Sequence, residues 1–238
     1  MAVAVVVPWR PSDDAHRSAA WDWVRRQYAE HHPTWEIVTG SCDGPWVKAD
    51  AVRDALTRTT ADRILLADAD VWSDGLQWAV GGLDEWPWTI PHHTVYRLTE
   101  ASTAAVLAGG RLGGATTQHP YKGYAGGGFL ALSRELYERV PLDPRFIGWG
   151  QEDQAWHLAL RRIAGFGPRG RADLWHLYHE PQPRMSRQVG SEASADLLTR
   201  YQRASTPQAM SDLIAEVTDG PSTDRPEPKR RAGAPAVT

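Results

Sequence analysis

The sequence has little cysteine, no long apolar run and almost no excess charge. Cys42 is the single cysteine among 238 residues, which excludes an internal disulfide and a zinc cluster built from cysteines. No apolar stretch approaches the roughly 20 residues needed to span a membrane. The net charge of −3 lacks the basic excess typical of nucleic-acid-binding proteins. These absences argue against a disulfide-stapled secreted module, a membrane-spanning protein and a dedicated nucleic-acid binder.

The first residues also lack the features of a targeting segment. Residues 1–7 are too short for a signal peptide and carry no basic region, so we expect a cytoplasmic protein. Tryptophan, by contrast, is unusually frequent, with 12 tryptophans against 3 phenylalanines. The count by itself fits either a core of large residues or a surface that stacks on sugars.

The first third of the chain alternates strand and helix patterns. Residues 2–7 and 63–67 are short apolar runs typical of buried strands, and residues 36–39 form another candidate strand. Apolar residues at helical spacing predict helices over residues 18–31 and 49–59. This order predicts an α/β fold of the Rossmann-like kind, with a mostly parallel central sheet flanked by helices.

The rest of the chain is less regular. Glycine pairs and prolines interrupt residues 81–128, where the strand signal is weak and confined to residues 94–98. Further predicted elements are a strand at 129–132 and helices at 133–139, 152–163, 192–202 and 208–217. From residue 219 onward the chain is rich in proline and nearly devoid of apolar residues, which predicts a disordered tail. We therefore expect one domain over residues 1–218 and a tail over residues 219–238.

Asp68 and Asp70 directly follow the apolar strand predicted for residues 63–67. Period-two geometry places both carboxylates on one side of that strand, at the edge where open α/β sheets bind ligands. Adjacent carboxylates are costly there unless a cation lies beside them. Hard oxygen ligands suit Mg²⁺, Mn²⁺ or Ca²⁺ better than zinc. The pattern alone also fits an ordinary polar strand end.

A second motif, residues 148–153, precedes the helix predicted for residues 152–163. Glycines on both sides of Trp149 predict a tight loop that carries one large stacking surface. The helix dipole favours the ionised forms of Glu152 and Asp153, and an ionised, positioned aspartate can act as a general base. Taken alone, the motif fits an acidic helix cap better than a catalytic site.

A third motif contains two histidines, in residues 175–179. Strand alternation would place His176 and Tyr178 on one face and His179 on the other. An imidazole added to the two aspartates would complete a manganese-type site. Which of the two histidines would serve stays open.

Glycine-rich segments distinguish between classes of nucleotide-binding protein. The run at residues 126–128, which includes Gly128, lets the backbone approach a ligand closely before the next strand. No lysine follows it at the Walker spacing, and no Gly-x-Gly-x-x-Gly follows the first strand. The chain also lacks a Gly-x-Ser-x-Gly elbow. These absences count against a nicotinamide dehydrogenase, a P-loop ATPase and an α/β-hydrolase.

Taken in order, the motifs resemble those of GT-A glycosyltransferases of the β-1,4-galactosyltransferase family. That family has Pro-Phe-Arg, Phe-Asn-Arg-Ala, Asp-x-Asp, Gly-Gly-Val-Ser-Ala-Leu-Ser-Lys-Glu and Gly-Trp-Gly-Gly-Glu-Asp segments. The similar segments of this chain are residues 5–10, 46–49, 64–70, 127–135 and 148–153. The resemblance covers residues 3–179, and the order of five motifs makes it more specific than any one of them.

The resemblance implies an inverting, metal-dependent transferase with a nucleotide diphosphate sugar, most simply a UDP-sugar, as donor. The residues it implies for donor binding are Pro8, Trp9, Arg10, Lys48, Asp68, Gly128 and Trp149. Those it implies for Mn²⁺ or Mg²⁺ are Asp68, Asp70 and His176. Glu152 would hold a sugar hydroxyl, and Asp153 would be the catalytic base.

The chain also departs from the family. Lys48 stands where the family has arginine, which weakens any bidentate contact with a phosphate. The loops that select the acceptor do not align, so a carbohydrate, a protein and a small molecule all remain open as acceptors, and the oligomeric state is open as well. Residues 87–91, 92–93 and 121–124 are candidate acceptor walls, although simple packing explains them equally well.

Three other functions are compatible with parts of the sequence. A carbohydrate-binding protein without catalysis would explain the tryptophans, but it has no need of a base beside a metal. A retaining GT-A transferase would share the motifs. A sugar nucleotidyltransferase would share the sheet and the metal, but it would need a glycine-rich turn after the first strand, where residues 8–11 read Pro-Trp-Arg-Pro.

Overall fold

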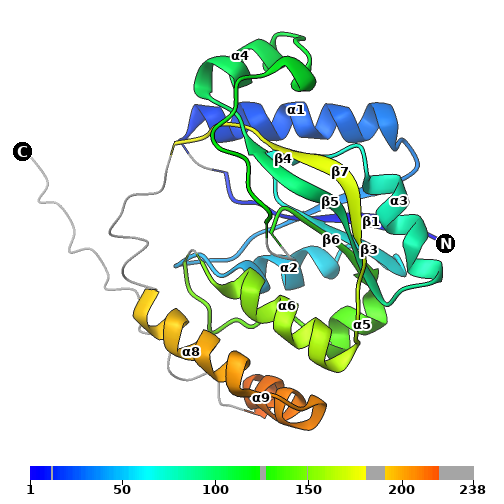
Figure 1. Ribbon diagram of the computed structural model, residues 1–238, viewed down its shortest axis with the longest axis vertical. Coiled ribbons are helices and arrows are strands. Elements are labelled where there is room, and N and C mark those ends of the chain that lie inside the picture. Colours follow the sequence, from blue (N-terminus) through cyan, green and yellow to red (C-terminus); the bar gives the residue numbers. More distant parts are fainter. Residues whose placement is uncertain (12, 124–126, 149, 181–190, 220–238) are drawn as a thin grey trace, which may run out of the picture.

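The computed structural model describes residues 1–11, 13–123, 127–148, 150–180 and 191–219 (Figure 1). A seven-stranded sheet lies between two layers of helices, which confirms the expected α/β fold. The tail predicted over residues 219–238 lies outside the described residues except for Asp219, the last residue of a helix. Within the described residues, no helix is both long and apolar enough to cross a membrane.

The sheet is mixed. In spatial order its strands are β2 (Glu36–Gly40), β1 (Val3–Pro8), β3 (Arg63–Ala67), β6 (Phe129–Ser133), β5 (Trp88–Arg97), β7 (Arg169–His176) and β4 (Val71–Trp72). β2, β1 and β3 are mutually parallel, as are β5 and β7, whereas β6 and β4 run antiparallel to their neighbours. Five of the seven strands therefore point in one direction, and β6 and β4 run against them.

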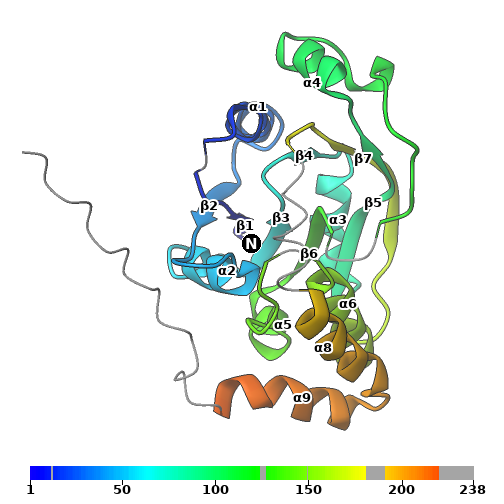
Figure 2. The same cartoon turned by 90° about the vertical axis from the view of Figure 1, so that its left-hand side faces the viewer.

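Each face of the sheet has its own apolar core, because side chains alternate along a strand. In β1, Ala4 and Val6 join one core while Val5 and Val7 join the other. The first core is covered by α2 (Lys48–Leu56), α5 (Arg134–Arg139) and α6 (Glu152–Ile163), and the second by α1 (Ala15–His31), α3 (Leu76–Gly81) and α4 (Glu100–Leu107). Figure 2 shows the two helical layers edge-on.

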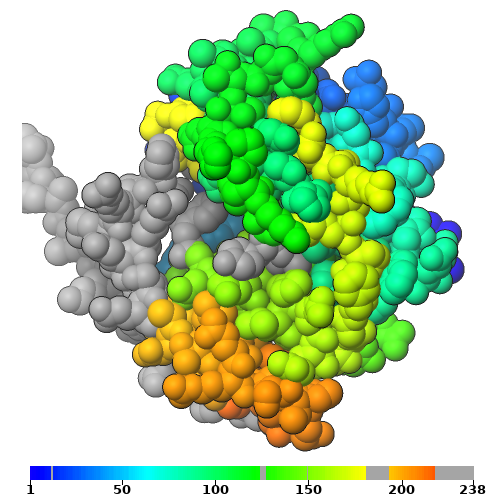
Figure 3. Space-filling model, in the orientation of Figure 1, coloured from blue at the N-terminus to red at the C-terminus, as the bar shows by residue number. Residues whose placement is uncertain are grey.

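The last two described helices extend the first layer. α8 (Ser191–Arg203) and α9 (Pro207–Asp219) pack against α6 and against each other. In the space-filling view they form the lower edge of the molecule in orange, next to α6 in yellow-green (Figure 3). Leu197, Leu198 and Met210 join the core that α6 shares with the sheet.

Several elements differ from the sequence-based expectation. α1 begins at Ala15 because the Asp14 carboxylate caps it, accepting hydrogen bonds from the backbone amides of His16 and Arg17 at 2.9 and 3.3 Å. β5 is longer than the expected strand at residues 94–98, since irregular pairing with β7 accommodates Pro91. α4 was not expected, because small residues dominate it and no apolar stripe marks one of its faces.

The end of β2 packs very closely on α2, and Gly40 makes this possible. A Cβ atom at Gly40 would lie 2.0 Å from the Ala51 carbonyl oxygen and 2.4 Å from the Ala55 nitrogen. We expect Gly40→Ala to lower the free energy of unfolding by about 1–3 kcal/mol, the usual cost of overpacking a core. The control is Gly81→Ala, whose Cβ would meet no atom within 4 Å. Equal urea midpoints for the two variants would contradict this packing.

Candidate active site

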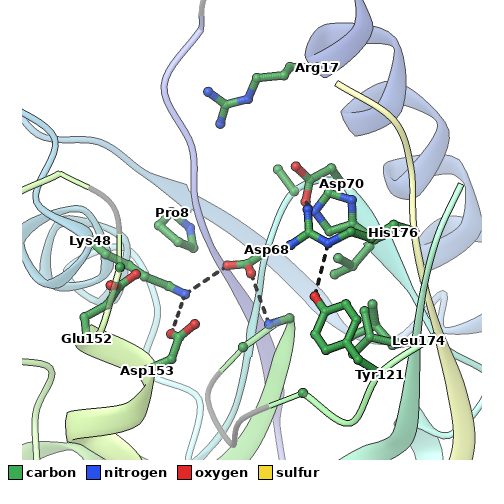
Figure 4. A pocket seen from close by; sticks show the side chains of 18 of the residues that line it. Pro8, Arg17, Lys48, Asp68, Asp70, Tyr121, Glu152, Asp153, Leu174 and His176 are labelled. Atoms are coloured by element: carbon green, nitrogen blue, oxygen red, sulfur yellow. Dashed lines mark hydrogen bonds and ion pairs between the residues drawn. The ribbon is translucent and has the colours of Figure 1, made fainter. Parts of the chain in front are cut away.

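A cavity of about 250 Å³ lies at the edge of the sheet where β1, β3, β5 and β7 end (Figure 4). All five segments that resemble the galactosyltransferase motifs, and the histidine motif at residues 175–179, supply residues to its wall. Its polar and aromatic lining includes Arg17, Trp46, Lys48, Asp68, Asp70, Arg97, Tyr121, Glu152, Asp153 and His176. Most of the residues that the sequence predicts for the site therefore meet at one edge of the sheet.

Asp68 is fixed from two sides immediately after β3. Its backbone amide donates to the Gly128 carbonyl oxygen at 2.9 Å, and the Gly128 amide donates to the Asp68 carboxylate at 3.1 Å. Gly128 has a φ of 81°, and a Cβ atom there would lie 2.2 Å from Leu174 Cδ1. The absence of a side chain at Gly128 thus lets the backbone lie close to Leu174, while the close approach to a ligand that the sequence indicated stays a prediction.

Lys48, at the start of α2, joins two of the predicted site carboxylates. Its residue is only 8% exposed, and its Nζ lies 3.0 Å from Asp68 Oδ1 and 3.2 Å from Asp153 Oδ1 (Figure 4). Burial alone would lower the pKa of Lys48, but the charges of Asp153 and Asp68 outweigh burial and raise it. The ammonium therefore stays charged and is already engaged by two carboxylates.

Asp153 has the properties of a strong carboxylate base. Burial raises its pKa well above the usual range, and the charges of Glu152 and Asp68 raise it further against the opposing effect of Lys48. The side chain is still 28% exposed and lines the cavity, so an incoming hydroxyl group can reach it. Such a carboxylate accepts a proton more readily than an ordinary aspartate does.

The turn into α6 orients Glu152 and Asp153. Gly148, Gly150 and Gln151 all have positive φ, at 82°, 107° and 74°, and α6 starts at the next residue. Glu152 lines the cavity, and its Oε2 is buried without a hydrogen-bond partner among the described residues. That atom is free to accept a hydrogen bond from a ligand. Trp149, predicted to bind the donor, lies outside the described residues.

Asp70, His176 and His179 form a second cluster. Asp70 Oδ1 lies 3.9 Å from His176 Nε2, and Asp70 Oδ2 lies 3.3 Å from His179 Nε2. One donor atom from each residue fits within 4.8 Å of the others. Pairing of β4 with β7 brings them together, since Val71 lies opposite His176 and Leu177 donates its amide to the Asp70 carbonyl at 2.8 Å.

This donor set fits a divalent metal ion. One carboxylate with two imidazoles suits Mn²⁺ and other transition metals. Burial raises the pKa of Asp70, but the charges of His176, His179 and Arg17 outweigh it and keep the carboxyl group ionised. Burial lowers the pKa of His176, which favours the neutral imidazole that a metal needs.

The expectation that Asp68 and Asp70 lie on one side of a continuing strand is wrong. β3 ends at Ala67, so period-two alternation does not continue into the aspartates: Asp68 pairs with Lys48, and Asp70 lies beside the histidines. The metal-ligand group found among the described residues contains Asp70 but not Asp68. A metal contact by Asp68 stays a prediction.

The face assignment at the end of β7 is also wrong. β7 ends at His176, so His179 is not on the opposite face but lies beside the same carboxylate of Asp70. Just beyond β7, the Tyr178 amide donates to Thr103 Oγ1 at 2.8 Å. The structure thus brings together both histidines between which the sequence left the choice open.

Arg10 and Trp9, predicted to contact the nucleotide, do not line the cavity. The Arg10 guanidinium donates to the Gly44 carbonyl at 2.9 Å and to the Cys42 carbonyl, and it lies 5.4 Å from the centre of the Trp46 ring. Trp9 packs against Trp21 with 6.0 Å between ring centroids. Pro8 and Trp46, from the same motifs, do line the cavity.

Of the candidate acceptor-wall residues, some line the cavity and others do not. Tyr121 lines the cavity, whereas Tyr124 lies outside the described residues. His92 is fully buried, so it does not form a wall, and burial lowers its pKa to about 3. His93 is exposed but does not line the cavity.

Two arginines of the cavity were missed. Arg97 ends β5, and the rule that parallel strands present ligand contacts at their carboxyl ends could have found it. Arg17 lies in the first turn of α1, which the sequence pattern placed three residues too late.

No protein-family model and no curated protein sequence matches the chain. Solved structures with a similar fold include the following three. The first is the Drosophila β-1,4-galactosyltransferase 7 in complex with manganese, UDP-Gal and xylobiose, with 14% identity, a TM-score of 0.44 and coverage of 80% of this chain and 74% of that one. The second is the Mycobacterium tuberculosis glucosyl-3-phosphoglycerate synthase in complex with phosphoglyceric acid, with 17% identity, a TM-score of 0.45 and coverage of 86% and 79%.

The third is a mannosyltransferase from Pyrobaculum calidifontis in complex with GDP-Man and Mn²⁺, with 16% identity, a TM-score of 0.47 and coverage of 89% and 67%. All three TM-scores are below 0.5.

Proposed function

We propose that the chain is a metal-dependent, inverting glycosyltransferase that transfers a sugar from a nucleotide diphosphate sugar to an acceptor hydroxyl. One observation carries the proposal: the same cavity is lined by a carboxylate of raised pKa, Asp153, and by two members of an Asp/His cluster, Asp70 and His176. The ordered motifs that resemble the β-1,4-galactosyltransferase family support it and favour a UDP-sugar.

Each side chain has a role that follows from its position. Asp153 takes the proton of the acceptor hydroxyl while the hydroxyl oxygen forms a bond to the anomeric carbon of the donor sugar. The bond between this carbon and the diphosphate breaks at the same time. Its electron pair leaves with the nucleotide diphosphate. Lys48 holds Asp153 and Asp68 in a fixed arrangement. The unpartnered Glu152 Oε2 accepts a sugar hydroxyl. A cation bound by Asp70, His176 and His179 would neutralise charge on the diphosphate.

A donor screen tests this proposal. Release of UDP or GDP from a panel of sugar nucleotides is measured with Mn²⁺ and again after chelation. We expect slow hydrolysis of one donor without acceptor, and its loss on chelation. Binding of free sugars with no turnover of any donor would instead indicate a carbohydrate-binding protein. Product NMR that shows retention at the anomeric carbon would contradict the inverting mechanism.

The proposed base predicts the pH dependence of transfer. Only ionised Asp153 accepts a proton, so the rate rises with pH through its pKa, which lies above the roughly 3.9 of an ordinary aspartate. Lys48 lowers that pKa, so Lys48→Met should raise it further and move the rising limb to higher pH. The control is Lys122→Met, which changes an exposed lysine that does not line the cavity. An unchanged or acid-shifted profile for Lys48→Met would contradict the pairing.

A further inference from the structure

Among the described residues of the cavity wall, carboxylates outnumber lysine and arginine side chains by four to three. The four carboxylates are those of Asp68, Asp70, Glu152 and Asp153. A nucleotide diphosphate would add further negative charge beside them. Binding therefore requires cationic groups that the protein has not already committed to its own carboxylates.

Two cations expected from the sequence to serve the diphosphate are already engaged. Lys48 Nζ lies 3.0 Å from Asp68 and 3.2 Å from Asp153, so it compensates carboxylates of the wall. Arg10 donates to the carbonyl groups of Gly44 and Cys42 and does not line the cavity. The charge of Lys48 is therefore balanced by carboxylates of the wall, and Arg10 lies away from the cavity.

Arg17 is a cation of the cavity wall that is not committed. Its Nε atom is buried, and its guanidinium makes no hydrogen bond or ion pair within the described part of the chain. Arg97, which also lines the cavity, differs in that its Nε donates to the Tyr121 hydroxyl at 3.1 Å. A buried donor without a partner is costly, which favours a ligand group at this position.

The position of Arg17 suits a group bound next to the Asp/His cluster. The guanidinium lies 5.6 Å from the centre of the Trp9 ring, and this stacking holds it in place. The charge of Arg17 helps to lower the pKa of Asp70, although burial and the two histidines have larger effects. Its charge therefore acts at that carboxylate. In Figure 4, Arg17 reaches in from α1 on the side of Asp70, away from Lys48, Glu152 and Asp153.

We propose that Arg17 is a donor-binding residue that holds an oxygen of the diphosphate through its guanidinium. The inference rests on the proposed function and adds a contact outside the motifs shared with the galactosyltransferase family. A guanidinium is suited to this task because its planar donors match two phosphate oxygens. Trp9 then acts through Arg17, by holding the guanidinium, and not by contact with the nucleotide.

The test compares binding of UDP, and of uridine as a probe without phosphate, in the presence of Mn²⁺. Loss of a charge-assisted hydrogen bond predicts that Arg17→Gln binds UDP about 10- to 100-fold more weakly, with uridine binding unchanged. Arg17→Lys should recover part of the affinity, because it keeps the charge. The matched control is Arg25→Gln: this α1 arginine also stacks on a tryptophan, 5.9 Å from the centre of the Trp21 ring, but does not line the cavity.

The outcomes separate this inference from the proposed function. Wild-type affinity for UDP in a folded Arg17→Gln variant would overturn the role of Arg17 and leave the transferase proposal intact. A parallel loss of uridine binding, or a thermal midpoint that falls with the affinity, would show that Arg17 acts through packing and would also overturn it. If the wild type binds neither UDP nor GDP, the proposed function itself fails.

Discussion

Replacing Asp153 with asparagine is expected to lower the transfer rate by about 10²- to 10⁴-fold, the usual contribution of a positioned general base. The amide is nearly the same size and can still accept a hydrogen bond from Lys48, which lies 3.2 Å away. The variant should therefore fold and bind UDP with Mn²⁺ like the wild type. Initial rates at saturating donor and acceptor measure the effect.

The matched control is Asp62→Asn. Asp62 is exposed and precedes β3, so it lies at the opposite end of the strand from the cavity. It should transfer at the wild-type rate. Transfer by Asp153→Asn within a few fold of the wild type would remove Asp153 from the role of base. A loss of UDP binding along with the rate would assign Asp153 to donor binding instead.

The second large effect is expected at the Asp/His cluster. Removal of either imidazole, by His176→Ala or His179→Ala, should weaken Mn²⁺ binding by more than the roughly 10- to 100-fold that follows loss of a residue that only orients a ligand. Both rings lie beside Asp70, with centroids 5.3 Å apart. Titration of Mn²⁺, followed by the electron paramagnetic resonance of the free ion, measures affinity without any donor.

His93→Ala serves as the control, since His93 is exposed and does not line the cavity. It should bind Mn²⁺ like the wild type. If only one of the two alanine variants loses affinity, a single histidine is the ligand. If neither does, the cluster does not hold the metal.

Local elements of the fold were predictable because local patterns determine them. The expected bounds 63–67 and 152–163 coincide with β3 and α6. Ser133 caps α5 as expected, accepting a hydrogen bond from the Leu136 amide at 3.1 Å. The antiparallel insertion of β6 between β3 and β5 was not predictable, because pairing between distant segments leaves no local signature.

In the site, too, the sequence indicated individual residues but not the pairings between distant ones. Motif order indicated Asp70, His176, Glu152 and Asp153, because these residues lie at element ends that meet at one sheet edge. Nothing in the sequence showed that Asp68 and Asp70 would diverge, since this depends on the point at which β3 ends. The pairing of Lys48 with Asp153 joins residues 105 positions apart, so only the folded chain reveals it.

We propose above all that this cavity takes a nucleotide diphosphate together with a metal ion. Calorimetric titration of UDP into the wild-type protein with Mn²⁺, repeated after chelation, tests it most directly. We expect one binding site, whose affinity for UDP falls strongly when the metal is removed. Absence of UDP binding with Mn²⁺, or binding that is indifferent to chelation, would contradict it.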